Sequence, residues 1–173
     1  MFLNRFVKSA KCEMAALSRN ILKISVFGCL FVATAMIILY AGSSPLWMRN
    51  LRIFRGGAFC VFLCYLSSVI FFFLCGGIIC TMLICKKAHL SSSVSVIIDI
   101  VIAYVFRMLW IILFFGGFSP LFALVSILAS LVFLIFAFVC SIKFSSVTSL
   151  LLTVMIIFTV VFIFLTLKFI IIT

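Results

Sequence analysis

Most of the chain beyond residue 23 consists of long apolar segments separated by short polar stretches. Each segment has about 20 residues or more, the length that a helix needs to cross a hydrocarbon core of about 30 Å. Inside lipid a lone span must satisfy its own backbone hydrogen bonds, so a helix is favoured even where Ile, Val and Thr are frequent. We therefore predict an all-α, polytopic integral membrane bundle. Its five transmembrane helices are expected over residues 24–42, 57–85, 94–115, 120–142 and 146–172.

The first 23 residues have a different, amphipathic pattern. Their apolar side chains fall on one side of a helical wheel and their basic side chains on the other. This is typical of a helix that lies in the membrane interface and faces anionic headgroups. Positive-inside anchoring of the next span or a mitochondrial transit peptide would use the same pattern. The basic residues are Arg5, Lys8, Lys11, Arg19 and Lys23.

These patterns predict two parts: a basic interfacial segment, 1–23, and a single transmembrane domain, 24–173. The small residues at 41–43 could form a cleavage site, and cleavage there would leave four spans. A tight antiparallel hairpin is expected at residues 116–120, where two glycines precede Ser119 as N-cap and Pro120 as first helical residue.

Composition excludes a soluble domain, because 69% of the residues are hydrophobic and only 9% are charged. The chain has 13 Lys and Arg residues against two acids, Glu13 and Asp99, for a formal net charge of +11. Such an excess in so apolar a chain indicates contact with anionic lipid headgroups. With no basic soluble domain present, nucleic-acid binding is not expected.

Orientation follows from the placement of Lys and Arg around the spans. More of them lie on the side of the N-terminus, which predicts that this end is cytoplasmic. A plasma or bacterial inner membrane is expected ahead of the mitochondrial inner membrane. The predicted inner side holds Arg5, Lys8, Lys11, Arg19, Lys23, Lys86, Lys87 and Lys143, and the outer side holds Arg49, Arg52, Arg55 and Lys168.

The loop between the first two spans, residues 43–56, has arginines at every third position, Arg49, Arg52 and Arg55. They are predicted to contact lipid headgroups, with an acidic partner as the alternative. Lys86 and Lys87, which follow the second span, are assigned the same contact.

Asp99 and Arg107 stand inside the third span. Each costs about 2.5–3.5 kcal/mol near the middle of a membrane helix, so each needs a compensating contact. Eight residues place them about 80° apart around the helix and about 12 Å apart along it, on one side but too far apart to touch. Asp99 could be met by Lys86 and Lys87 or by water from the interface. Arg107 could contact serine or threonine hydroxyls, backbone carbonyls near Gly76 and Gly77, the face of Trp110, another chain, or Asp99 through a water molecule.

Small residues line one side of the second and fourth predicted helices, and close helix packing is their expected role. Three threonines of the fifth predicted helix nearly superpose on the helical wheel. The cysteine spacing matches neither a dithiol nor a zinc site, so no metal or cofactor is expected. The second span carries Cys60, Cys64, Ser67, Ser68, Cys75 and Cys85; the fourth carries Ser126, Ser130, Ala137 and Ser141; the fifth carries Thr148, Thr159 and Thr166.

Catalysis is not expected, because acid–base and hydrolytic sites need two or three cooperating polar groups. Asp99 is the sole acid in the spans, and the sole histidine, His89, falls in a predicted loop. The favoured function is a non-catalytic subunit or scaffold of a membrane complex. Small-residue helix seams and an intramembrane Arg/Asp pairing, with Arg107 meeting an acidic residue of a partner or of a second copy, would hold the complex together. Asp99 and Arg107 are the predicted partner-binding residues. The alternative is a small channel or transporter with Asp99 and Arg107 lining a polar pathway.

Overall fold

The computed structural model describes residues 18–42, 57–84, 90–115, 119–142 and 145–172, and these contain five helices and no strand. The predicted all-α class is confirmed. The helix ends shift by a few residues where polar residues continue an apolar helix, as in the serine-rich first turn of α5. The helices are α2 (Ile21–Gly42), α4 (Gly57–Ile84), α5 (Leu90–Phe115), α6 (Pro120–Ser141) and α7 (Ser146–Ile172).

The helices have the length and surface of membrane spans. Segments of α4, α5, α6 and α7 are long and apolar enough to cross a bilayer, and α2 contributes a shorter apolar stretch, Ile21–Ile37. Large apolar side chains also cover the outside of the bundle: Leu121, Leu150 and Phe164 are each more than 60% exposed. A water-soluble surface rarely shows so much contiguous apolar area. The chain is therefore a helical integral membrane protein.

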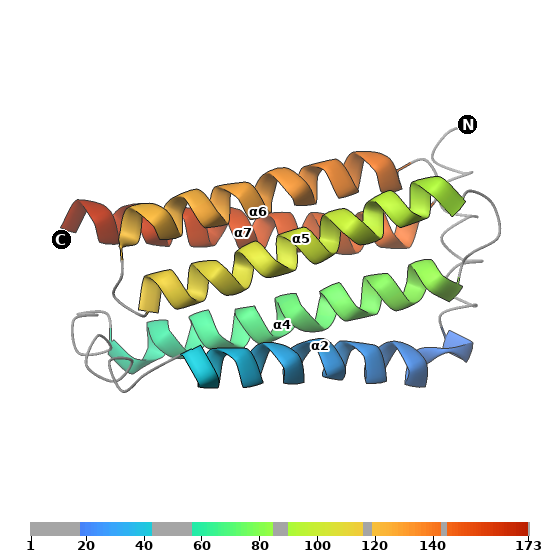
Figure 1. Cartoon of the computed structure of the whole chain (residues 1–173), viewed down its shortest axis with the longest axis horizontal. Helices are drawn as coiled ribbons and strands as arrows, with labels where there is room; N and C mark the ends of the chain where they lie inside the picture. The colour runs from blue at the N-terminus through green and yellow to red at the C-terminus, as the bar shows by residue number, and fades with distance from the viewer. Residues whose placement is uncertain (1–17, 43–56, 85–89, 116–118, 143–144, 173) are drawn as a thin grey trace.

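The helices lie side by side along the long axis of the molecule, with α5 in the middle (Figure 1). The α2–α4 pair packs on one side of α5 and α6 packs on the other, while α7 packs against α6 and α4. Successive helices run in opposite directions, so α2 begins at one end of the bundle and α7 finishes at the other. Ser119 takes the N-cap position of α6 with an extended backbone, and Pro120 follows it at the helix start.

Glycines bring α2 and α4 unusually close together. A Cβ atom placed on Gly76 would lie 2.5 Å from the backbone oxygen of Phe27, and one placed on Gly28 would lie 2.6 Å from the ring of Phe73. Small residues at a helix crossing allow this approach, because van der Waals contact between backbones replaces contact between side chains. The glycines thus set the separation of the α2–α4 pair.

Serines join α6 to the helices on either side of it. The Ser126 hydroxyl donates to the Phe106 carbonyl at 2.7 Å, and the Ser130 hydroxyl donates to the Ala103 carbonyl at 3.0 Å. At the other end of α6, the hydroxyls of Ser141 and Ser149 on α7 are 3.0 Å apart. The small-residue side of α6 therefore packs inside this chain, against α5 and α7.

Candidate functional site

Arg107 lies on the inward side of α5 and has no exposed surface. The helical period places it on the same face as Val96, Ile100, Ala103 and Phe114, which are also buried. A stripe of small and apolar side chains that packs against the other helices therefore contains one cation. Because Arg107 lies near the middle of the span, the groups around it must compensate for the cost of its charge.

Aromatic rings from three helices surround the Arg107 guanidinium. Its central carbon lies 4.0 Å from the ring centre of Phe162 on α7, 4.6 Å from that of Trp110 on α5, and 5.3 Å from that of Phe71 on α4. We call these three residues the aromatic cage. A cation over a desolvated ring gains about 2 kcal/mol or more. Contacts with three rings are therefore of the same order as the cost of placing the charge in the membrane, about 2.5–3.5 kcal/mol.

Hydrogen bonds and ring contacts hold the cage in place. The Trp110 indole N–H donates to the Thr166 hydroxyl at 3.1 Å, and that hydroxyl donates to the Phe162 carbonyl at 2.8 Å. The Trp110 ring also stacks on Phe114 and meets the edge of Phe162, with both centroid distances at 5.2 Å. Thr166 on α7 thus orients the Trp110 ring, which in turn packs against Phe162.

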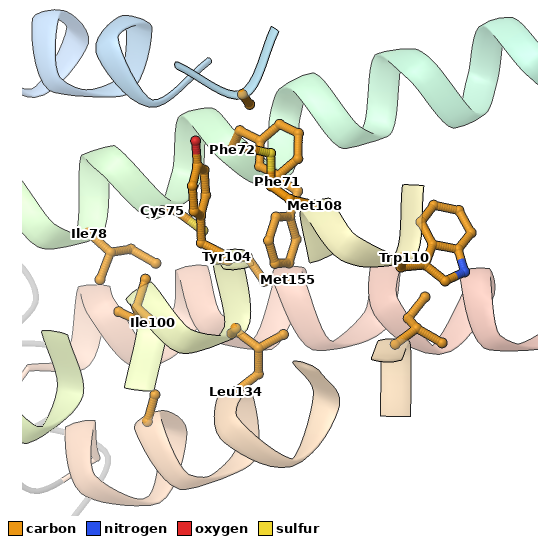
Figure 2. Packing of buried hydrophobic residues seen from close by; sticks show 14 of the residues in the cluster. Phe71, Phe72, Cys75, Ile78, Ile100, Tyr104, Met108, Trp110, Leu134 and Met155 are labelled. Carbon is orange, nitrogen blue, oxygen red and sulfur yellow. The ribbon is translucent and has the colours of Figure 1, made fainter. Parts of the chain in front are cut away.

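A second polar contact joins α5 to α2. The Tyr104 hydroxyl donates to the Phe31 carbonyl at 3.0 Å and lies 2.9 Å from the Thr34 hydroxyl. The rings of Phe31 and Phe72 meet the Tyr104 ring edge to face, at 5.0 and 5.2 Å. Figure 2 shows Tyr104 beside Phe72 and Cys75 in the layer between α4 and α5. Tyr104 therefore attaches α2 to the inward face of α5.

Asp99 has a different setting, because its side chain remains partly exposed. It precedes Ala103 by one helical turn, on the side of α5 that receives the Ser130 hydrogen bond from α6. It lies about 9 Å along the helix from Ser93, where the apolar segment of α5 begins. Asp99 is not among the contacts that the described residues make with Arg107, consistent with their separation of about 12 Å along the helix.

Asp99 belongs to a partly exposed strip at the boundary of two helices. The rings of Phe106 on α5 and Phe133 on α6 stack there at a centroid distance of 5.9 Å, and both are partly exposed. Phe106 follows Asp99 by two helical turns on the same side of α5. We call Asp99, Phe106 and Phe133 the α5–α6 edge. It combines a carboxylate with an aromatic pair on the outside of the bundle.

The residues predicted to contact lipid headgroups are not described by the structure. Arg49, Arg52, Arg55, Lys86 and Lys87 lie outside the described residues, as does the predicted interfacial segment up to residue 17. Within the described ranges no three His, Cys, Asp or Glu side chains gather closely enough to hold a metal ion. The thiols of Cys29, Cys75, Cys80 and Cys140 are free.

Sequence reasoning anticipated a contact between Arg107 and Trp110 but not the other two rings. Phe71 and Phe162 come from segments far from Arg107 in sequence, among many phenylalanines that look alike in an apolar run. One signal was available for Phe162, which stands between Thr159 and Thr166 on the threonine face of α7. No comparable signal marked the link from Tyr104 to α2.

No known protein family, curated protein or solved structure matches the chain.

Proposed function

We propose that the protein is a non-catalytic membrane subunit or scaffold that assembles with other transmembrane helices through the α5–α6 edge. The observation that carries this proposal is the contrast between the two charges of α5. Arg107 is fully buried among rings of its own chain, whereas Asp99 is partly exposed at the boundary of two helices. The charge accessible to a neighbouring helix is thus the acid.

The buried side of the bundle supports this assignment. Sequence alone allowed Arg107 and the small-residue seams to serve as contacts with other subunits. Ser126, Ser130 and Ser141 instead bond within the chain, and Arg107 is enclosed by α4, α5 and α7. A partner acid could reach Arg107 only after these helices separated. Arg107 and the serines of α6 thus support packing within the chain. Contacts with other subunits are therefore proposed for the outer surface of the bundle.

The energetics of Asp99 favour association. A carboxylate inside an apolar span costs about 2.5–3.5 kcal/mol on insertion scales. No described basic side chain pairs with it. A neighbouring helix that supplies a hydrogen-bond donor or a cation lowers this cost, and polar side chains hold membrane helices together in this way. Retaining an acid on the outside of the bundle is therefore consistent with a subunit.

The transport alternative receives less support from the geometry. A polar pathway lined by Asp99 and Arg107 requires both groups to face one water-filled space. Arg107 has no exposed surface, and apolar rings cover its guanidinium. Arg107, one of the two residues expected to line a pathway, therefore acts as a packing contact in this arrangement.

Native gel electrophoresis of membranes extracted in a mild detergent tests the proposal. The unmodified chain is expected in a particle larger than a single copy, Asp99→Leu is expected to shift it to the size of one copy, and Asp99→Glu is expected to retain the particle. A single-copy particle for the unmodified chain would overturn the proposal. So would ion or anion flux in liposomes that both Asp99→Asn and Arg107→Gln abolish, because that result supports a pathway.

A further inference from the structure

We infer that the partner recognised at the α5–α6 edge is a transmembrane helix of a different protein that carries a lysine or arginine at the depth of Asp99. This inference rests on the proposed function and names the chemistry of the partner. Its first basis is charge complementarity. A carboxylate within the apolar segment of α5 favours a cation beside it, because a charge-assisted hydrogen bond is about twice as strong as a neutral one.

The depth of Asp99 along α5 limits which basic residues could lie beside it. Asp99 lies about 13 Å along α5 from its first residue, Leu90, by the helical rise. The exposed basic side chains of the described residues lie before or near the end of a helix: Arg19, Lys23 and Lys168. Arg107, the basic residue at greater depth, is enclosed by the aromatic cage. A second copy, as far as it is described, therefore offers no accessible cation at the level of Asp99.

The remaining residues of the edge suit a helix as the occupant. Phe106 and Phe133 form a partly exposed stacked pair two turns from Asp99. Ser95, one turn from Asp99 in the other direction, is exposed. A helix lying along this strip would cover the rings with apolar side chains while its basic residue faces Asp99 and Ser95. A headgroup would not match this pattern, because the rings extend the strip toward the membrane centre.

A defined probe tests this recognition. The full chain is placed in liposomes with labelled leucine-rich transmembrane peptides, and association is measured by energy transfer. One peptide carries a single lysine about 9 Å inside its apolar stretch, one carries glutamate there, and one carries leucine only. We expect the lysine peptide to bind the unmodified chain about tenfold more tightly than the leucine peptide, a difference of about 1.4 kcal/mol.

Two variants of the chain are matched to this measurement. Asp99→Asn is expected to remove the preference for lysine. The exchange Ile98→Asp with Asp99→Ile keeps composition and depth but turns the carboxylate about 100° around the helix, onto a position that is 52% exposed in the native chain. This exchange should also lose the preference, because the acid no longer lies on the same side of α5 as Phe106.

The remaining outcomes overturn the inference. No lysine preference in the unmodified chain, or a preference that persists in Asp99→Asn or in the exchange, shows that the α5–α6 edge does not select a cation. Energy transfer between two labelled copies of the chain that depends on Asp99 assigns the site to a second copy instead. A native complex that survives Asp99→Asn removes this inference but leaves a subunit role standing, whereas a solitary native chain removes the proposed function itself.

Discussion

The guanidinium carbon of Arg107 on α5 lies 4.0 Å from the centre of the Phe162 ring on α7. Together with the hydrogen bond from Trp110 to Thr166, this contact joins two helices that are separated in sequence by the whole of α6. Because Phe71 on α4 adds a third side, one cation links three helices. We therefore expect the cage to contribute to the stability of the bundle through coupling between its members.

Truncating Phe162 tests that coupling. Phe162→Ala should lower the free energy of unfolding by about 3–5 kcal/mol, because it opens a cavity and removes a cation–π contact. In an Arg107→Met background the same truncation should cost about 1–2 kcal/mol less, because no cation–π contact with Phe162 is left to lose. Unfolding in sodium dodecyl sulfate, followed by circular dichroism, measures both values.

The control is Phe164→Ala, at a position that is 67% exposed, where we expect a change within about 0.5 kcal/mol. Arg107→Met alone should be close to neutral, because the cation–π contacts that are lost and the cost of burying the charge that is removed are of the same order. An equal cost of Phe162→Ala in both backgrounds would show that the ring stabilises the bundle by volume alone.

Two adjacent glycines of α4 give a matched comparison. Gly76→Ala should destabilise the bundle by about 1–3 kcal/mol, because its Cβ would meet the Phe27 backbone at 2.5 Å and backbone cannot yield cheaply. Gly77→Ala places its Cβ 3.5 Å from the Ile24 side chain, which is ordinary contact. This variant should be neutral or slightly stabilising, because alanine favours helix over glycine. Unfolding in sodium dodecyl sulfate measures both variants. Equal unfolding midpoints for the two would contradict a close α2–α4 crossing.

Removing the Tyr104 hydroxyl should loosen α2. Tyr104→Phe loses the hydrogen bond to the Phe31 carbonyl and the contact with Thr34, and we expect a cost of about 0.5–1.5 kcal/mol. Thr34→Val should add little to this variant, because the two hydroxyls serve one cluster. Protection of α2 from hydrogen exchange reports the effect locally. Full additivity of the two substitutions would indicate that they act independently.

Side-chain volume at Ser130 should matter more than its hydrogen bond. Ser130→Ala removes the donor to the Ala103 carbonyl, and the expected cost is about 0.6 kcal/mol, the average for hydrogen bonds between membrane helices. Ser130→Leu inserts a large side chain where no surface is exposed and should cost at least 1–3 kcal/mol, on the order of other overpacked sites. Val132→Leu, at a 47% exposed position of α6, is the control. A tolerated Ser130→Leu in detergent unfolding would show that α5 and α6 are not closely packed there.

Hydropathy was sufficient to predict the helices of this bundle but not all of their ends. An apolar run of membrane length must become a helix in lipid, so the five predicted segments correspond to α2, α4, α5, α6 and α7. The start of α5 differs because Leu90–Ser93 continues the helix beyond the apolar run. Polar residues near a membrane surface can be helical or not, and hydropathy does not distinguish these cases.

Helical periodicity also indicated which faces are packed, as Ser126 and Ser130 illustrate, since both are buried. It could not indicate what those faces meet. The lipid-facing and helix-facing sides of a membrane helix are both apolar, so the sequence pattern does not show which helices are neighbours. The partners of Arg107 were undecided for the same reason, because Phe71 and Phe162 become neighbours only when α4 and α7 pack around α5.

The sequence by itself therefore determined the environment, the secondary structure and the presence of two costly charges within one span. The tertiary structure decided that the cation is enclosed and that the acid is partly exposed. The physical reason is that lipid fixes the hydrogen bonding of each helix separately, whereas the fate of a side chain depends on the lateral packing of helices distant in sequence.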